Sequence, residues 1–124
     1  MASSVSRIPV RFVLEDGRHA DAELIRFLAP KTVDALLRRL PIEGRAARWK
    51  EEVYFESGVT VGLEKPKSKV ETGTVAFWPM GSAICIFHGQ TQPYGPVNII
   101  GAVRNGIEIF RDLPAGAKIR LEKA

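Results

Sequence analysis

Residues 73–89, with the sequence GTVAFWPMGSAICIFHG, constrain the fold of this chain more than any other segment. An apolar stretch, Ala76–Trp78, runs into a Pro-Met-Gly turn and leaves as the apolar run Ala83–Phe87. Two short apolar runs joined by a turn are typical of two buried strands. Trp78 lies beside the turn, and a bare surface indole there would be costly. We therefore expect it either to plug the end of the core or to line a cleft that holds a ligand.

The length and composition predict one globular domain with its own core, because the chain has 124 residues and is 45% hydrophobic. Residues 1–6 are a short polar lead, expected to be disordered or loosely held, and residues 7–124 are expected to form the domain. The lead lacks the basic and apolar regions of a signal peptide, and no apolar run is long enough to span a bilayer. A cytoplasmic protein with no membrane partner is the expectation.

The single cysteine, Cys85, lies inside an apolar run, which excludes an internal disulfide and predicts a buried, reduced thiol. The net charge of +4 is a small excess, and the basic residues are scattered. The one cluster, residues 65–69, has no interleaved aromatic residue that could stack on a base, so a solvated loop is expected and nucleic acid is not. Asn and Gln are sparse, which is a compositional feature of heat-adapted proteins.

Alternation of apolar and polar residues predicts a hairpin at the start of the chain, with strands at 7–14 and 19–24 around an Asp-Gly turn. His19 falls on its solvent-facing side. A helix is expected from Pro30 to Leu40, where apolar residues recur at helical spacing and Pro41 follows.

The remaining pattern predicts a mainly β protein. Strands are expected at 53–55, 70–77, 83–88, 97–103 and 118–122, with an extended piece at 59–61 and a short amphipathic helix at 107–113. Two short helices among six to eight strands favour a closed barrel, which hides the strand edges.

Three blocks in order along the chain resemble the cyclophilin fold: residues 29–40 (APKTVDALLRRL), 77–87 (FWPMGSAICIF) and 99–110 (IIGAVRNGIEIF). The chain is most similar to the small stand-alone prokaryotic cyclophilin-like proteins. Features similar to theirs are residues 49–55 (WKEEVYF), the Trp-Pro-x-Gly turn of residues 73–89, Thr91-x-Pro93 and Asn98-x-x-Gly101. The resemblance implies a closed eight-stranded cyclophilin-like β-barrel with two short capping helices.

For catalysis, the cyclophilin resemblance implies an arginine that donates a hydrogen bond to the twisted prolyl nitrogen, in a Phe-His-Arg phrase ahead of a Gln-Gly-Gly-Asp phrase. Residues 44–57 correspond to this region and contain neither phrase. Arg45 and Arg48 are the guanidinium candidates, and we take Arg48 as the candidate catalytic residue. The groove-floor strand also departs from the enzyme pattern, because Ala83 and Cys85 stand where active cyclophilins present a glutamine and an aromatic residue.

Other chemistry has less support in the sequence. His19 and His88 are far apart and have no ligand at metal spacing, so no metal site is expected. Glu51 and Glu52 are neighbours and point to opposite faces of a strand, so they cannot form a facing acid–base pair. The glycines form no phosphate-binding or dinucleotide motif, and no cofactor is expected.

The site most compatible with the sequence is a cleft beside Trp78 that binds an extended peptide or a small ligand. Its candidate residues are Trp78, Tyr54, Phe55, Phe87, Arg48, Glu52, His88 and Gln90. Alternation puts Ala83, Cys85 and Phe87 on one face of their strand and Ile84, Ile86 and His88 on the other, and only one set can face the cleft.

Two alternatives stay open at this stage. One is a peptidyl-prolyl cis-trans isomerase that uses an unmatched arginine. The other is a small-carboxylate or amide-binding relative of the cyclophilin-like domains in amide-processing enzymes, with Arg48 or His88 as the anchor. The ligand and the oligomeric state are not specified by the sequence.

Overall fold

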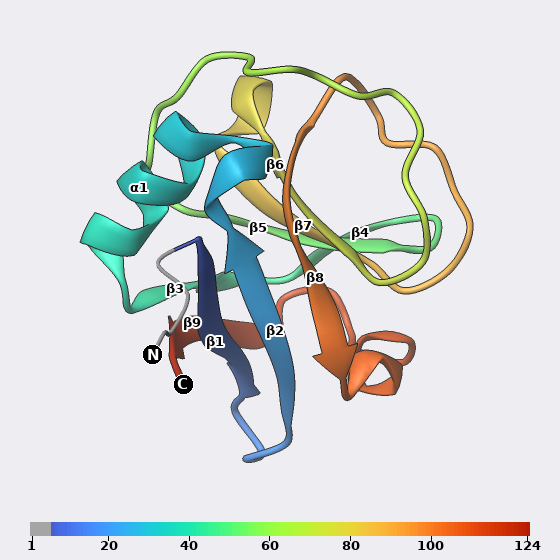
Figure 1. Cartoon of the computed structure of the whole chain (residues 1–124). Helices are drawn as coiled ribbons and strands as arrows, with labels where there is room; N and C mark the ends of the chain where they lie inside the picture. Colours follow the sequence, from blue (N-terminus) through green and yellow to red (C-terminus); the bar gives the residue numbers. More distant parts are fainter. Residues whose placement is uncertain (1–5) are drawn as a thin grey trace.

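The computed structural model of the protein describes residues 6–124. Nine antiparallel strands form one sheet, in the order β3-β9-β1-β2-β8-β6-β7-β5-β4, which curls into a nearly closed barrel (Figure 1). The strands are β1 (Arg7–Leu14), β2 (His19–Ile25), β3 (Ile42–Arg45), β4 (Ala47–Trp49), β5 (Glu52–Glu56), β6 (Thr74–Trp78), β7 (Ala83–Phe87), β8 (Asn98–Asn105) and β9 (Lys118–Lys123). The helical elements are α1 (Pro30–Arg39) and the 3-10 turns η1 (Arg26–Leu28), η2 (Pro79–Gly81) and η3 (Ile107–Phe110).

The predicted count of eight strands and two capping helices needs correction. Residues 42–49 supply two strands, because the chain leaves β9 at Ala46 and crosses to β5. Ala46 lies between β3 and β4, and its N–H donates to the Ala117 carbonyl at 2.7 Å. Residues 42–49 thus provide both edge strands of the sheet, β3 and β4. The two edges of the nearly closed barrel approach each other where this segment bends. The second predicted helix is the single 3-10 turn η3.

The helix prediction near Pro30 is confirmed by α1, which lies at one end of the barrel (Figure 1). Proline at its start costs no hydrogen bond, because the first N–H groups of a helix lack intrahelical partners. Its buried residues are Thr32, Val33 and Leu36. The last two follow from the predicted amphipathic spacing.

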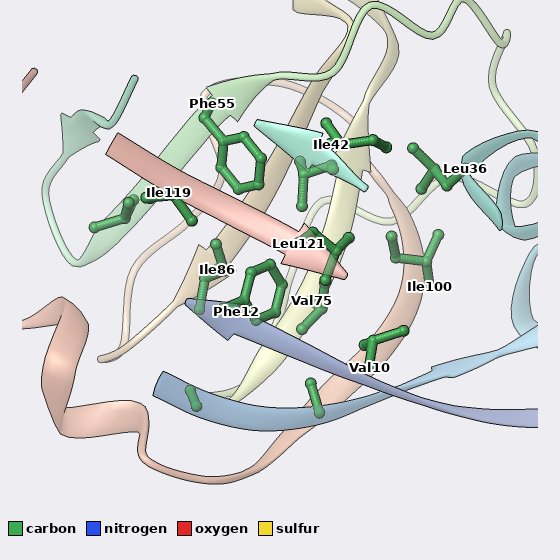
Figure 2. Packing of buried hydrophobic residues seen from close by; sticks show 14 of the residues in the cluster. Val10, Phe12, Leu36, Ile42, Phe55, Val75, Ile86, Ile100, Ile119 and Leu121 are labelled. Carbon is green, nitrogen blue, oxygen red and sulfur yellow. The ribbon is translucent and has the colours of Figure 1, made fainter. Parts of the chain in front are cut away.

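The barrel interior is filled by alternate, inward-pointing residues of the strands, as Figure 2 shows. Phe12 lies at its centre and makes edge-on contacts with Phe55 and Phe110, at centroid distances of 6.3 and 5.8 Å. Ile84 and Ile86 of β7 also belong to this interior cluster. The predicted alternation of the terminal hairpin is confirmed, with Val10, Phe12 and Leu14 buried.

The opposite face of β5, β6 and β7 carries a second, smaller apolar cluster. Its buried members are Ala76, Cys85, Phe87 and Val97, and Tyr54 and Trp78 pack against it. The structure therefore resolves the choice that the sequence left open, because Cys85 and Phe87 point out of the barrel towards Trp78. Cys85 is free and buried, as predicted.

Two long loops, residues 57–73 and 88–97, run along the side of the barrel where β4 lies (Figure 1). They are joined by two backbone hydrogen bonds between Lys67 and Val97, at 2.8 and 3.0 Å. Residues 65–69 are exposed, as expected for the lysine-rich loop, whereas residues 59–61 form no strand.

Asn98, at the start of β8, anchors the 57–73 loop through its side chain. Its side chain is fully buried and accepts a hydrogen bond from the Glu64 N–H while donating to the Thr32 hydroxyl and the Gly62 carbonyl. The Glu64 carboxylate in turn accepts hydrogen bonds from the Lys31 and Thr32 N–H groups. A loop residue thus caps α1, which has no side-chain cap of its own.

The expected lead at residues 1–6 lies outside the described residues except for Ser6, whose carbonyl accepts a hydrogen bond from the Arg26 N–H at 2.7 Å. Within residues 6–124, no helix combines the length and apolar character needed to cross a membrane.

Candidate functional site

An aromatic pocket opens on the outer face of the barrel, above the second apolar cluster. Its volume is about 350 Å³. The aromatic walls are Trp49, Tyr54, Trp78 and Tyr94. Glu52, Pro93 and Val97 complete the lining. We call this cavity the aromatic pocket below.

The β4–β5 hairpin supplies three of the lining residues. Trp49 pairs directly with Glu52 across a two-residue turn, and Tyr54 follows two positions along β5. Directly paired residues and residues two apart share one face of an antiparallel ribbon, so all three point to the same side. The turn is tight because Lys50 takes a left-handed conformation, with φ of 53°.

Trp78 enters the pocket from the end of β6, where the η2 turn redirects the chain. A Cβ atom on Gly81 would lie 2.5 Å from the six-membered ring of the indole. The ring therefore rests directly on the backbone of the turn, and any larger residue at position 81 would displace it. The Pro-Met-Gly turn that stood out in the sequence sets the position of the Trp78 ring.

Tyr94 comes from the 88–97 loop and links the two tryptophans. Its ring lies edge-on to Trp49 and Trp78, at centroid distances of 5.3 and 5.6 Å. Trp78 in turn meets Tyr54 edge-on at 6.1 Å. The four rings thus form a continuous series of T-shaped contacts. Aromatic pairs prefer this edge-to-face arrangement to direct face-to-face stacking.

Among residues 6–124, Glu52 is the only charged residue in the lining. It is 4% exposed, and its Oε1 atom is buried without a hydrogen-bond partner. Burial raises the pKa of this carboxyl, and the neighbouring Cys85 thiol opposes the shift in part. Burial, and then the Glu52 charge, raise the pKa of Cys85 well above its ordinary value of 9.0. The thiol is therefore neutral and unsuited to nucleophilic chemistry.

His88 is buried next to the pocket hairpin but does not line the pocket. Its Nδ1 atom approaches Glu51 Oε2 to 3.4 Å without a hydrogen bond. Burial lowers the pKa of His88, the Arg48 charge acts in the same direction, and the Glu51 carboxylate opposes both. The imidazole is accordingly neutral at pH 7.

Arg48 lies elsewhere. Its guanidinium donates to the carbonyl oxygens of Phe110, Arg111 and Leu113, at 3.0, 3.0 and 2.6 Å. It therefore holds the end of η3 against β4. The structure does not bring this arginine, which the sequence offered as a catalytic candidate, into the aromatic pocket.

Of the eight predicted site residues, the structure brings Trp78, Tyr54 and Glu52 together in the pocket. Phe55 points into the barrel interior, and Phe87 lies in the apolar cluster beneath the pocket. Gln90 borders a separate shallow depression beside Lys69.

Sequence reasoning missed Trp49 and Tyr94 as pocket residues, although Trp49 lay in a segment similar to the family. Lys-Glu is not a turn-forming pair, so nothing in the sequence marked the hairpin that places Trp49 opposite Glu52. Tyr94 is brought in by a loop whose path depends on the bridge to Lys67. Among residues 6–124, no group of three His, Cys, Asp or Glu side chains is arranged to hold a metal ion.

Comparison with known proteins gives a family match over nearly the whole chain. A family model described as "Cyclophilin-like" matches residues 8–122. The solution structure of the hypothetical protein AF2241 from Archaeoglobus fulgidus is 35% identical, with a TM-score of 0.84 over 100% of both chains. The structure of McbB in complex with tryptophan is 14% identical, with a TM-score of 0.76 over 92% of this chain and 44% of McbB. No curated protein sequence matches the chain.

Proposed function

We propose that this chain, which belongs to the cyclophilin-like family, is a binding protein that holds a small molecule or an extended peptide in the aromatic pocket beside Trp78. One observation carries the proposal. Three separate segments bring four aromatic rings around a cavity of about 350 Å³, with a buried polar group in its lining. Apolar walls with a few polar groups are typical of ligand sites.

Binding is favoured over prolyl isomerisation and thiol chemistry because the arginine and the cysteine near the pocket are committed or inert. Arg48 is held by three carbonyl oxygens, and Cys85 is a neutral thiol. The fold match to McbB, a protein determined in complex with tryptophan, is in keeping with a small ligand of similar size.

Thermal shift screening against metabolites and short peptides tests the proposal. A ligand at 100 times its Kd stabilises the folded state by about 2.7 kcal/mol. Unfolding entropy of about 2.1 cal/mol/K per residue makes this a rise of about 10 °C in Tm for 124 residues. Bound ligand should also change the intrinsic fluorescence, because both tryptophans of the chain line the pocket.

The matched variants are Trp78→Leu and Phe27→Leu. Phe27 is an exposed aromatic residue that does not line the pocket. We expect the thermal shift to be lost in the first variant and kept in the second. A screen without any hit, or hits that shift both variants equally, would refute the proposed function.

A further inference from the structure

The charge in the lining of the aromatic pocket is negative, and this sign restricts the chemical class of ligand that the pocket can bind. In the part of the chain that the structure describes, its one charged lining residue is an acid, Glu52, and no lysine or arginine lines it. Glu52 Oε1 is buried and receives no hydrogen bond. A buried carboxylate oxygen without a donor is costly, so this atom is the point where a ligand can gain most by supplying one.

The aromatic walls favour the same kind of ligand. Aromatic faces carry negative charge density and attract cations placed within about 6 Å of the ring centroid. The protein already shows this with one of the walls, because the Lys50 ammonium lies 5.4 Å from the Trp49 ring. Tyr54, Trp78 and Tyr94 add three further rings around the same cavity.

We infer that the ligand of the aromatic pocket carries a protonated primary or secondary amine, which donates to Glu52 Oε1 and lies against the faces of Trp49 and Trp78. The inference rests on the proposed function and specifies its ligand class. The rest of the ligand is a small, largely apolar body, since the lining beyond Glu52 is aromatic, proline and valine, and the other buried polar atom there without a hydrogen-bond partner is the Trp78 Nε1 donor. Such an amine would satisfy the unpaired oxygen and neutralise the only charge in the lining.

The alternatives fit less well. An anionic ligand would place its charge next to the Glu52 carboxylate. A neutral alcohol could donate the missing hydrogen bond but would gain little from the rings. Burial raises the pKa of Glu52 in the free protein, and a bound ammonium would favour the ionised carboxylate and oppose that shift.

Three probes with one body and different head groups test the inference. These are phenethylammonium, 2-phenylethanol and 3-phenylpropanoate, and binding is followed by fluorescence of the two pocket tryptophans. We expect the ammonium to bind about tenfold more tightly than the alcohol and the carboxylate to bind most weakly.

Glu52→Gln and Glu51→Gln form a matched pair of variants, because each removes one negative charge. Glu51 is adjacent in sequence but its side chain is 55% exposed and does not line the pocket. We expect Glu52→Gln to abolish the preference for the ammonium over the alcohol. Glu51→Gln should keep the preference for the ammonium over the alcohol. That result would exclude the protein's overall charge as the cause of the preference.

The outcomes separate this inference from the proposed function. If the alcohol binds as tightly as the ammonium, and both bindings depend on Trp78, the pocket binds ligands but amine recognition is refuted. Tightest binding of the carboxylate would refute it in favour of an anionic ligand. Equal loss of the preference in both variants would also overturn the role of Glu52. If no probe binds and the wider screen is flat, the proposed function itself fails.

Discussion

Asn98 offers the most direct test of how the structure holds the loops beside the pocket. It is fully buried, and its amide makes three hydrogen bonds to the 57–73 loop and to α1. Asn98→Ala removes all three and leaves the Glu64 N–H and the Gly62 carbonyl without these partners. Val97, its neighbour in sequence, lines the pocket.

The expected loss follows from the count of hydrogen bonds. Each contributes about 1 kcal/mol net, so Asn98→Ala should lower the free energy of unfolding by about 3 kcal/mol. With an unfolding entropy of about 0.26 kcal/mol/K for a chain of 124 residues, Tm should fall by about 11 °C. Thermal unfolding followed by circular dichroism measures this loss.

Asn105→Ala is the matched control. The Asn105 amide makes one exposed hydrogen bond, to Asp21 at 3.2 Å, so its loss should cost about 0.5 kcal/mol or less. Hydrogen exchange at the Glu64 amide should accelerate in Asn98→Ala and stay unchanged in the control. A Tm loss no larger than that of the control, or an unchanged Glu64 amide, would refute the anchoring argument.

Three further predictions concern the pocket and the barrel. Gly81→Ala should displace the pocket indole and weaken ligand binding measured by fluorescence, whereas Gly62→Ala, where a Cβ meets no atom within 4 Å, should leave it unchanged. Gly101→Ala should destabilise the protein by about 3 kcal/mol in denaturant unfolding, because its Cβ would overlap the Glu23 carbonyl oxygen of the neighbouring strand; a loss below about 1 kcal/mol would contradict this. Burial raises the pKa of Glu52 in the folded state, so the folded protein binds the carboxyl proton of Glu52 more tightly than the unfolded chain does. The contribution of Glu52 to stability therefore falls as the pH rises from its ordinary pKa of 4.5 through the raised value. Glu52→Gln should therefore be as stable as the wild type below pH 4.5 and more stable than the wild type at pH values above the raised pKa. Equal stability of the two proteins in unfolding curves from pH 4 to 8 would contradict the raised pKa.

Much of the barrel was predictable because its strands follow local rules. The hairpin of β1 and β2 combines strict alternation with an Asp-Gly turn, and α1 combines a proline start with helical spacing. The strand count was wrong at residues 42–49, because a bend at Ala46 depends on the strands that meet it from either side. No local residue pattern records that bend.

Two motifs that carried the family resemblance have clear structural reasons. Asn98 is the hydrogen-bonding anchor of the 57–73 loop, and Gly101 allows β8 to cross close to β2. The Trp-Pro-x-Gly turn places the Trp78 ring on the backbone of Gly81. These residues identified the fold from sequence because their roles are tied to its backbone geometry.

By itself, the sequence determined that the chain is a mainly β domain of cyclophilin-like type with an aromatic feature at Trp78. Tertiary structure decided which side of β7 faces the pocket, because that strand is apolar on both faces and alternation alone cannot distinguish inside from outside. It also decided that Trp49 and Tyr94 join Trp78, since they come from segments whose proximity depends on strand pairing and loop bridging. Strand periodicity is a local property of the chain, whereas a pocket built from distant segments exists only once the sheet has closed.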